Sequence, residues 1–158
     1  AHEFMHAIER RIQQMVWDNQ IENGFFLWDA FLPENYYYTN SYRAPDGSEY
    51  DSFNRPKYTP YDSDSYADIS NVYFVDGYST TFASEDMARI FENLFAAQSE
   101  LPYFFESPNL MIKAQYLCAV IRECLPSVSS SEEVIWERFV ELKPVEWFEE
   151  RYHIEAAG

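Results

Sequence analysis

The second to sixth residues of the chain, His-Glu-Phe-Met-His, place two imidazoles four positions apart with a carboxylate beside the first. On a helix such residues lie one above the other on the same face, so His2 and His6 can bind one metal ion together. Glu3 would then be free to act as a general base toward a metal-activated water. We interpret the segment as the core of a catalytic zinc site; the alternative is the solvated face of an amphipathic helix.

A catalytic zinc site uses three protein ligands and keeps the fourth position for water, so a third ligand must come from elsewhere. The longer motif H-E-x-x-H-x-x-G-x-x-H does not apply, because Glu9 stands at its glycine position and Ile12 at its last histidine position. His153, in an acidic C-terminal segment, is more typical of an ordinary surface or core histidine. Glu85 and Asp86 are better candidates, although acidic residues also simply favour a helix start, and spacing alone does not choose between them.

Several helices are expected to position these residues. Apolar residues recur at helical spacing from His2 to about Asn23, where Asn-Gly is a typical stop. Capping and proline signals predict later helices after Ser84, from Pro108 to just before Pro126, after Ser130, and over "KPVEWFEERYHI". Between the first two helices, "FFLWDAFL" is expected to pack as a short buried piece and "NVYFVDGYSTTF" to form a short strand or hairpin.

Residues 34 to 69 are rich in Tyr, Asp, Ser, Asn and Pro, which predicts a long irregular insertion suited to the wall of a cleft. Asp62, Asp64 and Asp68 alternate as in a calcium loop, but the Gly and Glu that such a loop requires are missing, so a solvated acidic loop is favoured. The many tyrosines could stack on sugar rings or on a peptide. They also pack long loops onto their own domain.

Composition narrows the possible functions. A chain of 158 residues that is 47% hydrophobic fits one domain, residues 1–158, whose core needs no disulfide or structural metal. The formal net charge of −16 argues against nucleic acid as a partner. We expect no transmembrane segment, because no apolar run is long enough. Cys118 and Cys124 have neither metal-pair nor disulfide spacing and are expected to be buried thiols.

"HEFMH" followed by "GYSTTFASEDMARIFE" resembles the gluzincin metallopeptidases, in particular the lethal-factor and Pro-Pro endopeptidase type and related zinc-binding peptidases of bacterial surface lipoproteins. In that group the third zinc ligand is a Glu that opens a later helix, and a Tyr seven residues before it faces the metal. The resemblance implies that Glu85 completes the Zn²⁺ ligand set with His2 and His6. It also implies that Glu3 is the general base.

The same resemblance suggests the remaining roles. Tyr78, seven residues before Glu85, would stabilise the oxyanion, and Tyr73 is the fallback. Asp86 would either orient a ligand histidine or only favour the helix start.

The implied fold is mainly α: the portion of a zincin-like catalytic domain from the H-E-x-x-H helix onward, with the sheet that normally precedes it absent. The implied function is that of a zinc-dependent peptidase acting on peptide or protein substrates. We expect a monomer, located outside the bacterial cell or on its surface as in the lipoprotein members. The alternative from a different class is a non-catalytic extracellular module that binds carbohydrate or protein through its aromatic-rich loop.

Overall fold

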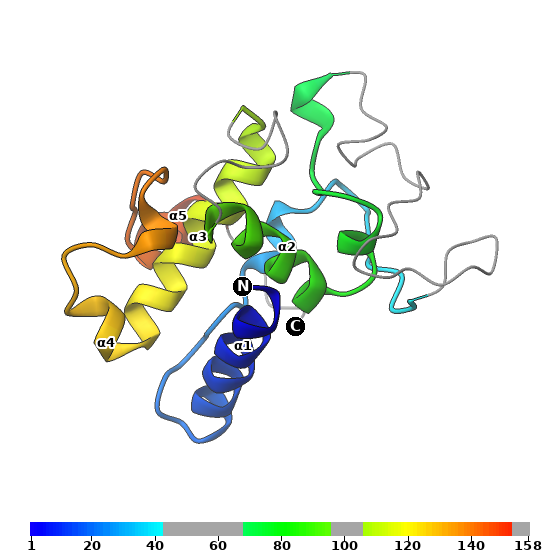
Figure 1. Cartoon of the computed structure of the whole chain (residues 1–158). Helices are drawn as coiled ribbons and strands as arrows, with labels where there is room; N and C mark the ends of the chain where they lie inside the picture. Colours follow the sequence, from blue (N-terminus) through cyan, green and yellow to red (C-terminus); the bar gives the residue numbers. More distant parts are fainter. Residues whose placement is uncertain (43–67, 96–105, 153–158) are drawn as a thin grey trace.

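The computed structural model describes residues 1–42, 68–95 and 106–152, and about 60% of them are helical (Figure 1). The prediction of a mainly α fold is confirmed. The expected strand or hairpin in residues 71–82 is wrong, because the described residues contain no β-strand. This segment forms a single β-bridge residue at Phe74, bends, and the 3₁₀ turn η3, Tyr78–Thr80. Asp76 stabilises that turn by accepting hydrogen bonds from the backbone N and Oγ of Ser79.

Helix α1, His2–Trp17, carries the H-E-x-x-H motif in its first two turns. Met5, Ile8 and Ile12 are buried on one face, which leaves the two motif histidines partly buried on the adjoining face. The helix ends at Trp17 rather than near Asn23, because Asn19 has a φ of 56°, a left-handed conformation that a helix cannot continue through.

Helix α2, Ala83–Phe95, packs against α1 on one side and against α3, Pro108–Cys124, on another (Figure 1). It is buried along most of its length, including its polar residues Glu85, Asp86 and Arg89. A helix that buries charged groups must supply partners for them, because an unpaired buried charge is costly. These partners organise the site described below.

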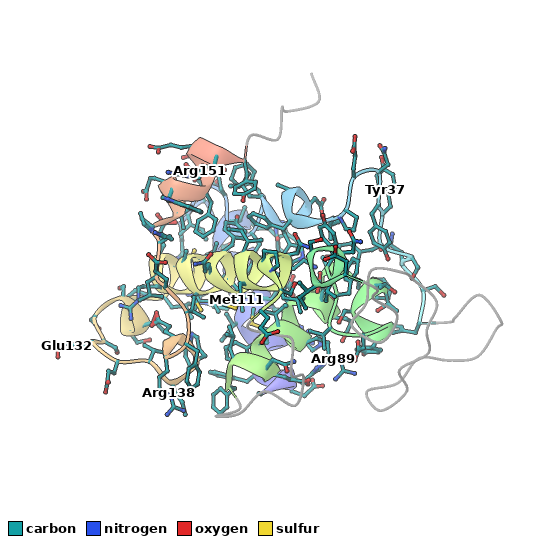
Figure 2. All side chains as sticks on the ribbon, turned by 90° about the horizontal axis from the view of Figure 1, so that it is seen from above. Tyr37, Arg89, Met111, Glu132, Arg138 and Arg151 are labelled. Atoms are coloured by element: carbon teal, nitrogen blue, oxygen red, sulfur yellow. The ribbon has the colours of Figure 1, made fainter. Side chains whose placement is uncertain are left out.

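Helix α3 begins as predicted, with the Ser107 hydroxyl accepting a hydrogen bond from the Leu110 backbone N at 3.2 Å. It runs through the centre of the molecule (Figure 2). The predicted short buried piece forms the 3₁₀ turn η1, Trp28–Phe31, which packs on α3. The Leu27 backbone N donates to the hydroxyl of the buried Tyr116 at 3.2 Å. Cys118 and Cys124 are free and buried, as predicted.

The C-terminal part contains α4, Pro126–Ser129, the 3₁₀ turn η4, Ile135–Glu137, and α5, Val145–Arg151. The short last helix was predicted, but the helix expected after Ser130 is wrong. Arg122 of α3 binds the Glu137 carboxylate at 2.6 Å and the Ser131 backbone O at 3.1 Å, which holds this stretch as an irregular loop against α3. In this conformation the apolar side chains of Ile135 and Phe139 are 44% and 51% exposed.

Of the acidic positions considered for calcium, Asp68 is described. It caps the 3₁₀ turn η2, Ile69–Asn71, by accepting from the backbone N of Ser70 at 2.9 Å. Asp62 and Asp64 lie outside the described residues. None of the described helices is long and apolar enough to cross a membrane.

Candidate metal centre

His2 and His6 of α1 and Glu85 of α2 bring three metal-binding groups to one point. The two Nε2 atoms lie 3.1 Å apart, Oε2 of Glu85 lies 3.0 Å from Nε2 of His2, and Oε1 lies 3.2 Å from Nε2 of His6. Zinc bonds of about 2.0–2.1 Å in a tetrahedral site place ligand atoms about 3.3–3.4 Å apart. The three separations lie within about 0.4 Å of these values, and Glu85 faces the two imidazoles through its two different oxygens.

The chemistry of this donor set also fits a cation. Two imidazole nitrogens and a carboxylate face one another, and their lone pairs need a proton or a metal between them. Hydrogen bonds to Glu85 and then to Glu92 raise the pKa of His2 to about 9. Burial alone would raise the pKa of Glu85, but hydrogen bonds from His2 and Tyr78 outweigh it and hold the value at about 2. The site thus favours positive charge between ionised carboxylates.

Glu92 provides a contact that sequence reasoning missed. Its Oε1 lies 2.6 Å from Nδ1 of His2. A carboxylate can only accept, so Nδ1 carries the hydrogen, and Nε2 is the nitrogen directed at the other two donor groups. Glu92 lies seven residues after Glu85, a spacing that returns to the same helix face. This spacing is the feature of the sequence that could have indicated Glu92.

Asp86 lies in the first turn of α2, where an acidic residue favours the start of a helix. It is fully buried, accepts from the Tyr38 hydroxyl at 2.6 Å and pairs with Lys113 of α3 at 2.8 Å. Lys113 also donates to the backbone O of Tyr73. Asp86 therefore ties the first turn of α2 to α3, while Glu92 is the carboxylate that contacts Nδ1 of His2.

The structure places Tyr78 at the site. Tyr78 lines the same cavity as Glu85, and its ring centroid lies 6.1 Å from that of His2. Burial, followed by the interaction with Glu85, raises the pKa of Tyr78, so the phenol keeps its proton and can donate. Tyr73 does not line the cavity beside the histidines. Of the two tyrosines considered, Tyr78 is the one with access to this point.

Tyr42 is a second phenol that sequence reasoning missed. Its hydroxyl donates to Oε1 of Glu85 at 3.1 Å, and its ring stacks on Tyr78 with centroids 6.0 Å apart. The backbone N of Asn40 donates to the O of Thr81 at 2.8 Å, which anchors the segment leading to Tyr42 beside η3. Its place in a tyrosine-rich stretch gave no basis for choosing it over its neighbours.

The side chains of His2, His6 and Glu85 line a cavity of about 330 Å³. Glu3 is exposed, and its carboxylate lies with the two motif imidazoles in a group whose ligand atoms are all within 4.8 Å. The described residues that line this cavity are His2, Glu3, His6, Glu9, Arg10, Tyr42, Tyr78, Ser84 and Glu85. Arg10 is the one lysine or arginine among them. Glu3 therefore lies close enough to the two imidazoles to bind an ion with them or to reach a molecule bound in the cavity.

Comparisons of the chain with protein-family models, with curated proteins and with solved structures gave no match. His153, the third histidine, lies outside the described residues.

Proposed function

We propose that the chain is a zinc-dependent peptidase of the gluzincin type, with His2, His6 and Glu85 as the zinc ligands. The observation that carries the proposal is the convergence of these three groups at mutual distances of 3.0 to 3.2 Å, across two helices far apart in the sequence. The orienting carboxylate on Nδ1 of His2 gives independent support, because histidines that bind zinc are commonly held in this way.

When bound, zinc supplies a Lewis acid that polarises the scissile carbonyl and acidifies water. Glu3, at the cavity and outside the proposed ligand set, accepts the proton of the attacking water and passes it to the leaving amine. Tyr78 keeps its proton and donates a hydrogen bond to the oxyanion that forms at the carbonyl. Tyr42 donates to Glu85 and so helps to hold that ligand.

The substrate is a peptide or protein. Acidic side chains at the cavity, Glu3 and Glu9 among them, favour neutral or basic segments near the scissile bond. The resemblance to peptidases of bacterial surface lipoproteins supports an extracellular or cell-surface location.

The test is cleavage of a fluorogenic peptide library by the zinc-loaded protein, with Glu3→Gln compared against Glu9→Gln. Both variants neutralise a carboxylate of α1 that lines the same cavity. Loss of a general base should lower the rate by about 10²–10⁴-fold in Glu3→Gln, with zinc still bound. Glu9→Gln should stay within a few-fold of the parent. Cleavage that persists in Glu3→Gln, or that survives removal of the metal by a chelator, would count against the proposal.

A second candidate is a binding module for neutral carbohydrate, favoured by a different surface. Tyr37 is 84% exposed and lies at the outer edge of the molecule (Figure 2). It lines a cavity of about 440 Å³ that also presents Asp29, Glu34, Asn35, Tyr36 and Asn40. Exposed tyrosines beside carboxylates and amides suit stacking and hydrogen bonding to sugars. Binding of neutral trisaccharides that is lost in Tyr37→Ala and unaffected by chelation would support this candidate.

A further inference from the structure

A buried arginine lies between the histidine side and the tyrosine side of the proposed zinc site. Arg89 lies on α2 (Figure 2), one turn after Glu85. It is only 4% exposed. It does not line the cavity, so it has no direct role in the proposed reaction. Burying a guanidinium is costly unless its partners are well placed, so its contacts indicate what the position requires.

One set of contacts leads to His2. Nη1 of Arg89 lies 3.1 Å from Oε2 of Glu92, and the other oxygen of that carboxylate lies 2.6 Å from Nδ1 of His2. The planar guanidinium thus restricts the orientation of Glu92. It also offsets the negative charge of Glu92 in a molecule of net charge −16. The orientation of the His2 ring therefore depends on Arg89 through one intervening side chain.

The other set of contacts leads to Tyr78. Nε of Arg89 lies 3.4 Å from Oδ2 of Asp76, whose Oδ1 accepts from the backbone N of Ser79 at 3.0 Å. Asp76 thereby holds the turn η3, which carries Tyr78. The guanidinium carbon also lies 4.7 Å from the centroid of the Tyr78 ring, a cation–π distance. The same side chain therefore supports both the backbone and the ring of Tyr78.

We propose that Arg89 is a positioning residue that couples the two halves of the site, aligning His2 for the metal and Tyr78 for the substrate. This inference rests on the proposed function. A purely structural arginine would stabilise the fold without altering metal affinity. A positioning arginine changes zinc affinity through Glu92 and turnover through Tyr78, and it does so in a protein that remains folded.

The experiment compares Arg89→Met and Arg89→Lys with the parent and with Arg122→Met. Arg122 is a matched control, because it also forms a close ion pair with a buried carboxylate, Glu137, and it lies on α3 away from the cavity. The zinc dissociation constant is measured by competition with a chromogenic chelator. The absorption spectrum of the Co²⁺-substituted protein reports ligand geometry, kcat and KM are measured on a peptide that the parent cleaves, and circular dichroism checks folding.

Arg89→Met should weaken zinc binding about 10-fold, which is the smaller loss expected when a residue that orients a metal ligand is removed. It should also alter the absorption spectrum of the cobalt protein. It should lower kcat about 10-fold or more while KM stays within about 2-fold, because the oxyanion donor is misplaced. Arg89→Lys keeps the charge and should recover only part of each loss, because an ammonium lacks the planar fork. Arg122→Met should lower thermal stability and leave zinc affinity and kcat within about 2-fold.

A double variant tests the route. Because Arg89 acts on His2 through Glu92, adding Glu92→Gln to Arg89→Met should weaken zinc binding by less than about 2-fold further. If the double variant weakens zinc binding by the product of the two single losses, the proposed coupling through Glu92 would be overturned. An Arg89→Met protein that binds zinc as tightly as the parent would also overturn it. If Arg89→Met fails to fold, Arg89→Lys decides by the same criteria. A parent that binds no zinc would overturn both this inference and the proposed function, whereas unchanged affinity in the Arg89 variants would overturn the inference alone.

Discussion

Nδ1 of His2 on α1 lies 2.6 Å from Oε1 of Glu92, close to the C-terminal end of α2. The first turn of the same helix supplies Glu85, whose Oε2 lies 3.0 Å from Nε2 of His2. The two nitrogens of one imidazole are therefore each held by a carboxylate of α2. The packing of α1 against α2 consequently determines the geometry of the proposed zinc site.

Replacing Glu92 by Gln should weaken zinc binding by about 10-fold or more, because the amide is a poorer partner for Nδ1 of His2 and lowers the basicity of the ring. Chelator competition measures the effect. Glu123→Gln, which neutralises an exposed glutamate of α3, is the matched control and should leave the affinity unchanged. Equal affinities in the parent and in Glu92→Gln would show that Glu92 does not support a metal ligand.

Zinc binding should depend on pH through His2. Glu85, followed by Glu92, raises the pKa of this histidine to about 9, so it is protonated near pH 7 in the metal-free protein. Zinc requires the neutral ring, so binding should release about one proton from His2. The zinc affinity should therefore rise about tenfold for each unit by which the pH is raised, up to about pH 9. Calorimetry at pH 7 in buffers of different ionisation enthalpy measures this release. Zinc binding without proton release would contradict the interpretation.

The same shift has a consequence for the metal-free fold. Because the folded pKa of His2 lies above its ordinary value of 6.5, its ion pairs stabilise the fold fully below pH 6.5. That stabilisation should be lost as the pH rises through about 9. Denaturant unfolding with metal removed should therefore show stability falling across this window, and falling less in Glu92→Gln.

Replacing Tyr78 by Phe should lower kcat by about 10²–10³-fold, the usual effect of removing one oxyanion donor. Zinc content should be unchanged, because Tyr78 is not a ligand. Tyr73→Phe is the matched control, since its side chain does not line the cavity, and it should keep nearly full activity. The reverse order of effects would assign the oxyanion role to Tyr73.

Replacing Lys113 by Met should destabilise the protein by about 3–5 kcal/mol, because Asp86 would be left as a buried charge without its cation. Burial lowers the pKa of Lys113 and raises that of Asp86, so the pair depends on mutual compensation. Lys143→Met removes an exposed pair with Glu141 and should cost about 0–1 kcal/mol. Denaturant unfolding compares the two variants, and similar losses of stability would show that burial does not determine the cost of breaking these pairs.

The helices that were predicted correctly carry their signals locally. Ser107 and Pro108 define the start of α3 through a side-chain cap and a missing N–H, both of which are visible in the sequence. The stretch after Ser130 has an equally good local pattern, but Arg122 of α3 binds Glu137 and the Ser131 backbone and holds another conformation. A contact with a different helix thus overrode a local preference, and no sequence pattern on that stretch reports it.

The residues of the candidate site also differ in whether local sequence patterns predict them. Its histidines follow from a spacing of four on one helix, and the choice of Glu85 followed from a family resemblance. Glu92 and Tyr42 reach the site from positions 90 and 43 residues away from their partners, His2 and Glu85. Those contacts depend on how α1, α2 and the segment before residue 42 pack together. Side-chain identity alone did not distinguish them from the many other acidic and tyrosine residues of the chain.

Whether α1 and α2 form a zinc site is decided by the zinc content of the purified protein, measured by elemental analysis after equilibration with zinc and removal of excess. We expect about one zinc per chain in the parent, with a sharp loss in His6→Ala and in Glu85→Ala. Glu9→Ala, from the same cavity, should retain the metal. No bound zinc in the parent, or the same zinc content in all four proteins, would contradict the assignment of His2, His6 and Glu85 as zinc ligands.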